Sequence, residues 1–130
     1  MLFQFDVRTE SKTEMIDITD RISSFLKKSK VSDGICAVYV PHTTAAVTIN
    51  EGADPDVKND IIKELNKVVP FSDGYHHSEG NSAAHIKSSL VGASLNLIVE
   101  KGEFILGTWQ AVYFCEFDGP RNRRVILKII

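Results

Sequence analysis

The spacing of apolar residues in the first part of the chain predicts a strand, a helix and a second strand. Residues 2–8 alternate roughly between apolar and polar positions, which is typical of a strand. Apolar residues then recur three and four positions apart, so we expect a helix over residues 20–29 with Thr19 as its N-cap. Residues 34–41 are almost continuously apolar, which predicts a strand buried on both faces.

A second helix is predicted where Asp54 and Pro55 precede a run of apolar residues at helical spacing. Asp54 can cap the helix and Pro55 suits its first position, while Pro70 ends the run. Residues 70–80 are rich in loop-forming residues. A short helix should follow over residues 83–91.

The remaining apolar segments predict strands. They cover residues 44–50, 94–100, 104–106, 109–117 and 123–130. Residues 123–130 carry apolar side chains at both alternating sets of positions, so we expect this strand to be buried partly against other copies of the chain. Together these elements predict one compact α+β domain over residues 1–130, built from a largely antiparallel sheet and two to three helices.

Composition narrows the class of protein. The chain has 130 residues and a net charge of -2, which argues against a dedicated nucleic-acid-binding protein. No apolar run is long enough to cross a membrane, and the first residues lack the pattern of a secretory leader. Cys36 and Cys115 lie in apolar runs, so we expect two buried free thiols and a cytoplasmic protein.

The four histidines fall in three short polar segments. His42 lies between two predicted strands, His76 and His77 lie in the predicted loop, and His85 lies on the short helix. Imidazole is the commonest metal ligand in proteins, and a loop histidine can reach the same ion as a helical one. The pattern therefore favours a shared polar site, although each ring could instead satisfy a separate hydrogen bond.

Three further features suggest chemistry. Glu51 follows a predicted strand and could serve as a general base or an oxygen ligand. Arg121, Arg123 and Arg124 lie beside carboxylates in a predicted turn, where they form either a phosphate-binding group or a set of solvated ion pairs. Trp109 is interpreted either as a core aromatic or as a flat wall for a planar ligand.

Three stretches of the sequence resemble the YjbQ family of secondary thiamine-phosphate synthase enzymes. They are VPHTTAAVTINEGADPDV at 40–57, YHHSEGNSAAHIKSSLVG at 75–92 and LGTWQAVYFCEFDGPRNRRV at 106–125. The resemblance implies a compact α+β domain that assembles as a homotrimer. It also implies a reaction that joins a pyrimidine diphosphate to a thiazole phosphate and releases pyrophosphate.

The same resemblance nominates site residues and a cofactor. Bound metal is expected near the histidines, and the family pattern selects His77 over His76 because it places the important histidine two residues after an aromatic. The candidates that it implies are His42, His77 and His85 for the metal and Glu51, Arg121 and Arg123 for catalysis.

More than one metal and more than one reaction class would fit these residues. Three imidazoles suit zinc better than magnesium, although magnesium would suit a diphosphate. The expected ligand is a small phosphorylated metabolite. A metal-assisted hydrolase, or a non-enzymic module that binds such a metabolite, would need much the same residues.

Overall fold

The chain forms eight strands and three helices, and a computed structural model describes all residues 1–130. The strands are β1 (Leu2–Arg8), β2 (Glu14–Asp17), β3 (Asp33–Tyr39), β4 (Ala45–Glu51), β5 (Ser94–Glu100), β6 (Glu103–Phe104), β7 (Gln110–Glu116) and β8 (Asn122–Ile129). The helices are α1 (Thr19–Ser29), α2 (Pro55–Val68) and α3 (Ser82–Val91). The strands form a five-stranded sheet in the order β1-β8-β3-β5-β6 and a three-stranded sheet in the order β2-β7-β4.

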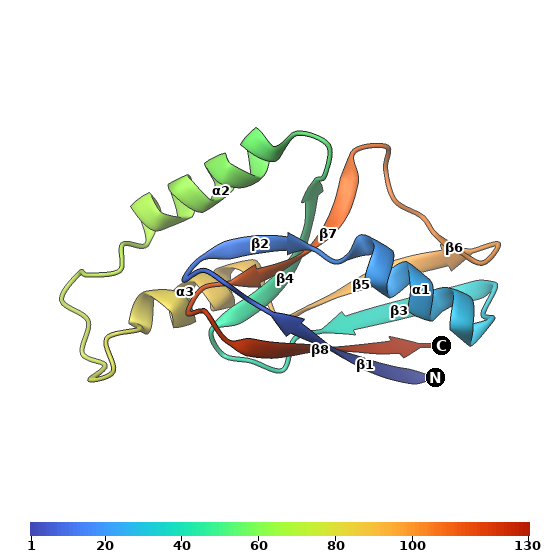
Figure 1. The fold of residues 1–130 in the computed structure, drawn as a ribbon, viewed down its shortest axis with the longest axis horizontal. Helices are drawn as coiled ribbons and strands as arrows, with labels where there is room; N and C mark the ends of the chain where they lie inside the picture. Colours follow the sequence, from blue (N-terminus) through green and yellow to red (C-terminus); the bar gives the residue numbers. More distant parts are fainter.

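The two sheets and the helices α2 and α3 form successive layers (Figure 1), and β7 lies at the centre of the smaller sheet. Val112 and Phe114 belong to the larger core, which the inner face of the five-stranded sheet and α1 share. Ala111, Tyr113 and Cys115 face the other way, into a smaller core that includes residues of α2 and α3. Because both of its faces are covered, β7 is the strand with a nearly continuous buried pattern.

These elements confirm the predicted α+β domain with antiparallel sheets. All six strand pairings are antiparallel. Asp54 caps α2 as predicted, by accepting a hydrogen bond of 2.9 Å from the Asp56 amide, and Gly92 follows the end of α3. No helix is long and apolar enough to cross a bilayer.

The start of α1 differs from the prediction. Thr19 is the first residue of the helix, and Ile18 occupies the N-cap position without a side-chain cap. The Thr19 hydroxyl instead accepts a hydrogen bond of 2.9 Å from the Val112 amide of β7. The predicted N-cap was therefore wrong because tertiary contact with β7 uses the side chain that could have capped the helix.

Two strands predicted to be buried on both faces are buried on one face only. In β3, Cys36 and Val38 are buried while Ile35 and Tyr39 are exposed. β8 alternates in the same way, and its buried residues Val125, Leu127 and Ile129 face the larger core of this chain. Within one chain the prediction for β3 was wrong, because no element of this chain covers the outer face of the five-stranded sheet. Burial of β8 against other copies of the chain stays a prediction. Strand β2 was not predicted, since four residues give too short a pattern.

Both cysteines are buried and unpaired, as predicted. Burial raises the pKa of Cys36 to about 11 and that of Cys115 to about 12. Since only the thiolate reacts readily, we expect neither thiol to be alkylated at a measurable rate in the folded protein at neutral pH. Alkylation followed by mass spectrometry should label both after denaturation without reductant. Labelling of neither under those conditions would contradict the free-thiol assignment.

Candidate functional site

The largest pocket of the protein is polar and has a volume of ≈ 680 Å³. It lies where the segments that follow β3 and β7 meet the loop before α3 and the first turn of that helix. The side chains with candidate chemistry in its lining are His42, Thr44, His77, Glu79, Asn81, His85, Asp118, Arg121 and Arg123. The pocket therefore gathers residues from three segments that the sequence had singled out separately.

His77 and His85, two of the three histidines expected near a metal, lie next to each other in the pocket. Their ring centroids are 5.6 Å apart and the rings are perpendicular. Neither imidazole forms a hydrogen bond within the protein, and the nearest charged partner is Glu79, whose Oε2 lies 3.9 Å from His77 Nε2. His76 does not line the pocket. The ring nitrogens of His77 and His85 are thus free to bind a ligand.

His42 also lines the pocket, but its Nε2 already has a partner. Nε2 accepts a hydrogen bond of 3.1 Å from the backbone amide of Arg124. Burial lowers the pKa of His42, and the nearby charges of Arg123 and Arg124 lower it further. The ring is therefore neutral with its proton on Nδ1, so His42 offers a ligand a donor rather than a lone pair.

Arg123 is held by a buried carboxylate. Its Nε donates to Glu116 Oε2 at 2.8 Å and its Nη2 donates to Oε1, while Nη2 also reaches the Thr44 hydroxyl at 2.9 Å. Glu116 is 0% exposed and Arg123 is 5% exposed. Nη1 is the one guanidinium nitrogen of Arg123 without a hydrogen bond to the protein, so it remains for an anion in the pocket.

Glu116 also connects this arginine to the chain around it. Its Oε2 accepts a hydrogen bond of 2.8 Å from the Thr9 hydroxyl, and its Oε1 accepts one of 2.9 Å from the Asp118 amide. The carboxylate therefore ties the segment after β1, the turn after β7 and β8 into one buried network. Such a network is stable only while its members are all satisfied.

Asp118 binds two other residues that line the pocket. It accepts hydrogen bonds of 3.0 Å from Arg121 Nη2 and 2.9 Å from Asn81 Nδ2. Burial raises the pKa of Asp118, but these two hydrogen bonds and the charges of Arg121 and Arg123 outweigh burial, so the pKa is lowered overall. Asp118 is therefore a carboxylate at neutral pH and acts as an acceptor toward both partners.

The turn that carries Asp118 and Arg121 needs glycine at position 119. A Cβ placed on Gly119 would lie 2.3 Å from the carbonyl oxygen of Ser11 and 2.9 Å from Thr9 Oγ1. Distances this short require one backbone segment to move. Gly119 thus lets the turn pack closely on the segment after β1 and fixes the position of the two charged side chains.

Two residues of the pocket could serve as metal ligands. No group of three or more His, Cys, Asp or Glu side chains is arranged to hold an ion. The imidazoles of His77 and His85 are nevertheless the donors that zinc and other late transition metals prefer, and both are free of protein partners. These two residues fit a metal ion, whereas His42 does not fit while the Arg124 amide occupies its Nε2.

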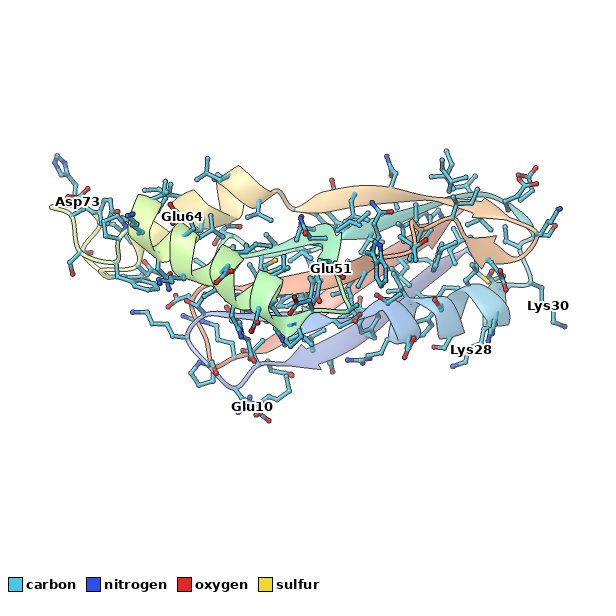
Figure 2. The ribbon with its side chains drawn as sticks, turned by 90° about the horizontal axis from the view of Figure 1, so that it is seen from above. Glu10, Lys28, Lys30, Glu51, Glu64 and Asp73 are labelled. Atoms are coloured by element: carbon cyan, nitrogen blue, oxygen red, sulfur yellow. The ribbon has the colours of Figure 1, made fainter.

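Glu51 and Trp109 lie away from this pocket. Glu51 ends β4 and lies near the middle of the molecule's length, whereas Asp73, in the loop before α3, lies at one end (Figure 2). The Glu51 carboxylate accepts a hydrogen bond of 2.8 Å from the amide of Ala53. Trp109 is 65% exposed and lines a smaller pocket with Asp17, so it is not a core aromatic. Within one chain, neither residue takes part in the histidine pocket.

The sequence did not single out Asn81, Glu116 or Asp118 as parts of the site. Asn81 occupies the N-cap position of α3, but its side chain makes no cap hydrogen bond. The carboxylates Glu116 and Asp118 were interpreted as members of a solvated turn. A glutamate that ends an apolar strand and lies seven residues before an arginine could have indicated a buried ion pair.

Comparison with known sequences identifies close relatives over the full length. A family profile described as UPF0047 protein YjbQ-like matches residues 3–130. The chain is 54% identical over 130 residues to a UPF0047 protein of Methanocaldococcus jannaschii, covering 100% of this chain and 94% of the relative. It is 50% identical over 131 residues to the UPF0047 protein YugU of Bacillus subtilis, covering 100% of this chain and 99% of the relative.

Solved structures share the same fold. A YjbQ/UPF0047-family protein of Clostridium acetobutylicum is 52% identical, with a TM-score of 0.97 over 98% of this chain and 99% of that chain. A protein of Sulfolobus solfataricus, described as YbjQ-like and of unknown function, is 31% identical, with a TM-score of 0.96 over 99% of this chain and 95% of that chain. These names give a family and no reaction.

Proposed function

The chain belongs to the UPF0047 family of YjbQ-like proteins, and we propose that it is a metal-dependent enzyme with thiamine-phosphate synthase-type activity. In that reaction a pyrimidine diphosphate and a thiazole phosphate are joined and pyrophosphate is released. The observation that supports the proposal is the pairing of two unengaged imidazoles, His77 and His85, with the arginines of the same pocket.

The positive and negative side chains of the pocket largely balance each other. Arg121 and Arg123 line the pocket together with the carboxylates Glu79 and Asp118, and Arg123 is neutralised further by Glu116 behind it. The lining therefore has little positive charge to offer a diphosphate. A divalent cation on His77 and His85 would supply that charge and stabilise the departing pyrophosphate.

In the proposed reaction the side chains of the pocket bind the phosphate groups while one bond forms and another breaks. The thiazole nitrogen attacks the methylene carbon of the pyrimidine, and the bond between that carbon and the diphosphate oxygen breaks, so that its electron pair leaves with pyrophosphate. Arg123 Nη1 and the Nδ1–H of His42 are donors for the phosphate oxygens. The nitrogen that attacks carries no proton, so the reaction needs no general base. This agrees with the position of Glu51 outside the pocket.

The metal is proposed to be zinc, because two imidazole ligands favour late transition metals over magnesium. The test is metal analysis of the purified protein together with an assay of the two precursors. We expect bound zinc and formation of thiamine phosphate that a chelator abolishes and added metal restores. Magnesium would be indicated instead if only that ion restored activity.

Three outcomes would contradict the proposal. Hydrolysis of the pyrimidine diphosphate without any coupling would indicate a hydrolase. Tight binding of a precursor without turnover would indicate a binding module for a phosphorylated metabolite. Protein that binds neither metal nor precursor would remove the pocket from consideration as the site.

We further propose that the protein assembles as a homotrimer. The outer face of the five-stranded sheet exposes Ile35 and Tyr39 on β3, opposite Ile98 on β5 and Ile126 on β8. Helix α2 is amphipathic but has no fully buried residue, and it lies at the outside of the molecule (Figure 1). Apolar surface of this extent on two elements supports association with further copies of the chain.

Replacement of Ile98 by glutamate tests this assembly. Light scattering should report three chains of 14.5 kDa for the parent protein and a smaller species for Ile98→Glu, because a charge cannot be buried there without a partner. Leu90→Glu is the matched control, since Leu90 is 64% exposed but lies on α3 rather than on the sheet face. A monomeric parent protein at micromolar concentration would contradict the proposal.

The cysteines and the net charge of the chain indicate where the protein works and what it binds. Two buried thiols without a disulfide suit the reducing cytoplasm, and we place the protein there. The net charge of -2 supports neither a nucleic-acid partner nor an anionic membrane surface. The partner that the pocket fits is a small phosphorylated metabolite.

A further inference from the structure

Asn81 contains one of only two buried side-chain polar atoms in the protein that have no hydrogen-bond partner. The atom is Oδ1, and the other is the hydroxyl oxygen of Thr13. Asn81 lines the histidine pocket and lies at the N-cap position of α3, but its side chain does not cap the helix. Buried polar groups are nearly always paired in folded proteins, so this oxygen needs an explanation.

The orientation of the Asn81 amide is fixed by its neighbour. Nδ2 donates a hydrogen bond of 2.9 Å to Asp118 Oδ2. The same Oδ2 atom also accepts a hydrogen bond of 3.0 Å from Arg121 Nη2, so it faces donors on both sides. Turning the amide over would place two oxygens against each other. Oδ1 therefore remains the free acceptor, and the carboxylate behind the amide increases the negative charge on it.

The spacing of the sequence brings Asn81 to the same side of the start of α3 as His85. Asn81 lies four residues before His85, so the two side chains leave the start of α3 on the same side. His77 lies four residues before Asn81 in the loop, and its ring contacts that of His85. All three residues line the same pocket.

We propose that Asn81 Oδ1 is an oxygen ligand of the metal ion that His77 and His85 hold. This inference rests on the proposed function, because it needs an ion in the pocket. Bonds from a metal to oxygen are about 2.0–2.2 Å long, whereas a hydrogen bond is about 2.9 Å, so an ion approaches an enclosed oxygen more closely than a water or an amino group does. Two imidazoles and one oxygen also leave coordination positions for a diphosphate.

The role of Asp118 follows from this assignment. Asp118 acts as a positioning residue rather than a ligand, since its hydrogen bond with Nδ2 keeps Oδ1 on the side of the amide away from Asp118. Arg121 in turn fixes Asp118. The charge of the arginine is thereby connected to the metal through two hydrogen bonds.

The experiment measures zinc affinity by competition with a chromogenic chelator, using protein stripped of metal. Asn81→Leu removes the oxygen at nearly constant volume, and we expect its affinity for zinc to fall at least tenfold, within the range of about 10–100-fold that even indirect partners of a metal contribute. Asn81→Asp combined with Asp118→Asn keeps an oxygen at position 81 and restores a donor–acceptor pair between the two side chains, so this double variant should bind zinc within a few fold of the parent. Asp118→Ala, which keeps the Asn81 oxygen but no longer fixes the orientation of its amide, should lose less affinity than Asn81→Leu.

A spectroscopic measurement keeps the test independent of activity and folding. Cobalt added to the stripped parent protein should give a visible spectrum that changes in Asn81→Leu, because the set of ligands has changed. Equal zinc affinity and an unchanged cobalt spectrum in Asn81→Leu would overturn the inference and leave the proposed metal site intact. If the parent protein binds no metal, both the inference and the proposed function fall.

Discussion

Replacement of Glu116 by alanine is expected to lower the free energy of unfolding by about 3–5 kcal/mol, which is the usual cost of removing one partner of a buried ion pair. The substitution would leave the positive charge of Arg123 without its carboxylate partner in a position where the residue is only 5% exposed. The hydroxyl of Thr9 and the amide of Asp118 would each lose the carboxylate oxygen that accepts their hydrogen bond. Chemical denaturation followed by circular dichroism measures the loss.

The exposed ion pair of the same turn supplies the control. Arg121 and Asp118 are 3.0 Å apart, but the arginine side chain is 54% exposed, so Arg121→Ala should change stability by no more than about 1 kcal/mol. Replacing Glu116 and Arg123 together with leucine and methionine should restore part of the loss, since no charge is then left unpaired. If Glu116→Ala cost as little as Arg121→Ala, the network would not have the structural role assigned to it.

Single alanine substitutions of His77 and His85 are expected to reduce bound metal by tenfold or more and to abolish coupling of the two precursors. Each removes one of the two free imidazoles, and the loss of a direct ligand should exceed the tenfold that an indirect partner typically contributes. The domain should remain folded because neither ring belongs to the two hydrophobic cores. Metal content by mass spectrometry and thermal unfolding measure the two effects.

Two other histidines serve as matched controls for this prediction. His76→Ala changes a neighbouring residue outside the pocket and should leave metal content intact. His42→Ala should also retain metal, because Nε2 of His42 is occupied by the Arg124 amide, but it should bind pyrophosphate more weakly. Loss of metal in His42→Ala would show that this imidazole exchanges its backbone partner for the ion. Loss of metal in His76→Ala, with metal retained in His77→Ala, would show that His76 is the metal ligand of the loop.

The fold could be predicted from the sequence where local pattern and tertiary environment agree. Asp54 and Pro55 start a helix in any context, and the prediction for α2 was correct to within a residue. Strand β3 shows the opposite case, since its continuous apolar run suggests burial on both faces while Ile35 and Tyr39 remain exposed in this chain. Composition alone does not distinguish a strand covered by its own domain from one that another copy must cover.

The site was predictable in its residue types and not in their connections. His77, His85 and the arginines stand in polar segments between apolar ones, which is a local signal. The hydrogen bond from Arg124 to His42 joins residues that are 82 positions apart, and it decides which imidazole is free. No spacing rule predicts that contact. The ion pair of Arg123 with Glu116 spans only seven residues, but the sequence does not show that it is buried.

The position of β8 has a consequence for how the protein is made. β8 follows every other strand in sequence, yet it lies between β1 and β3 within the five-stranded sheet. During synthesis β1 and β3 leave the ribosome first and cannot pair with each other across the gap that β8 will fill. The pairing of Phe5 with Val125 must wait for more than a hundred residues of chain. Nascent chains should therefore expose unpaired sheet edges until β8 emerges. A ribosome-associated chaperone that shields these edges should raise the yield of folded protein.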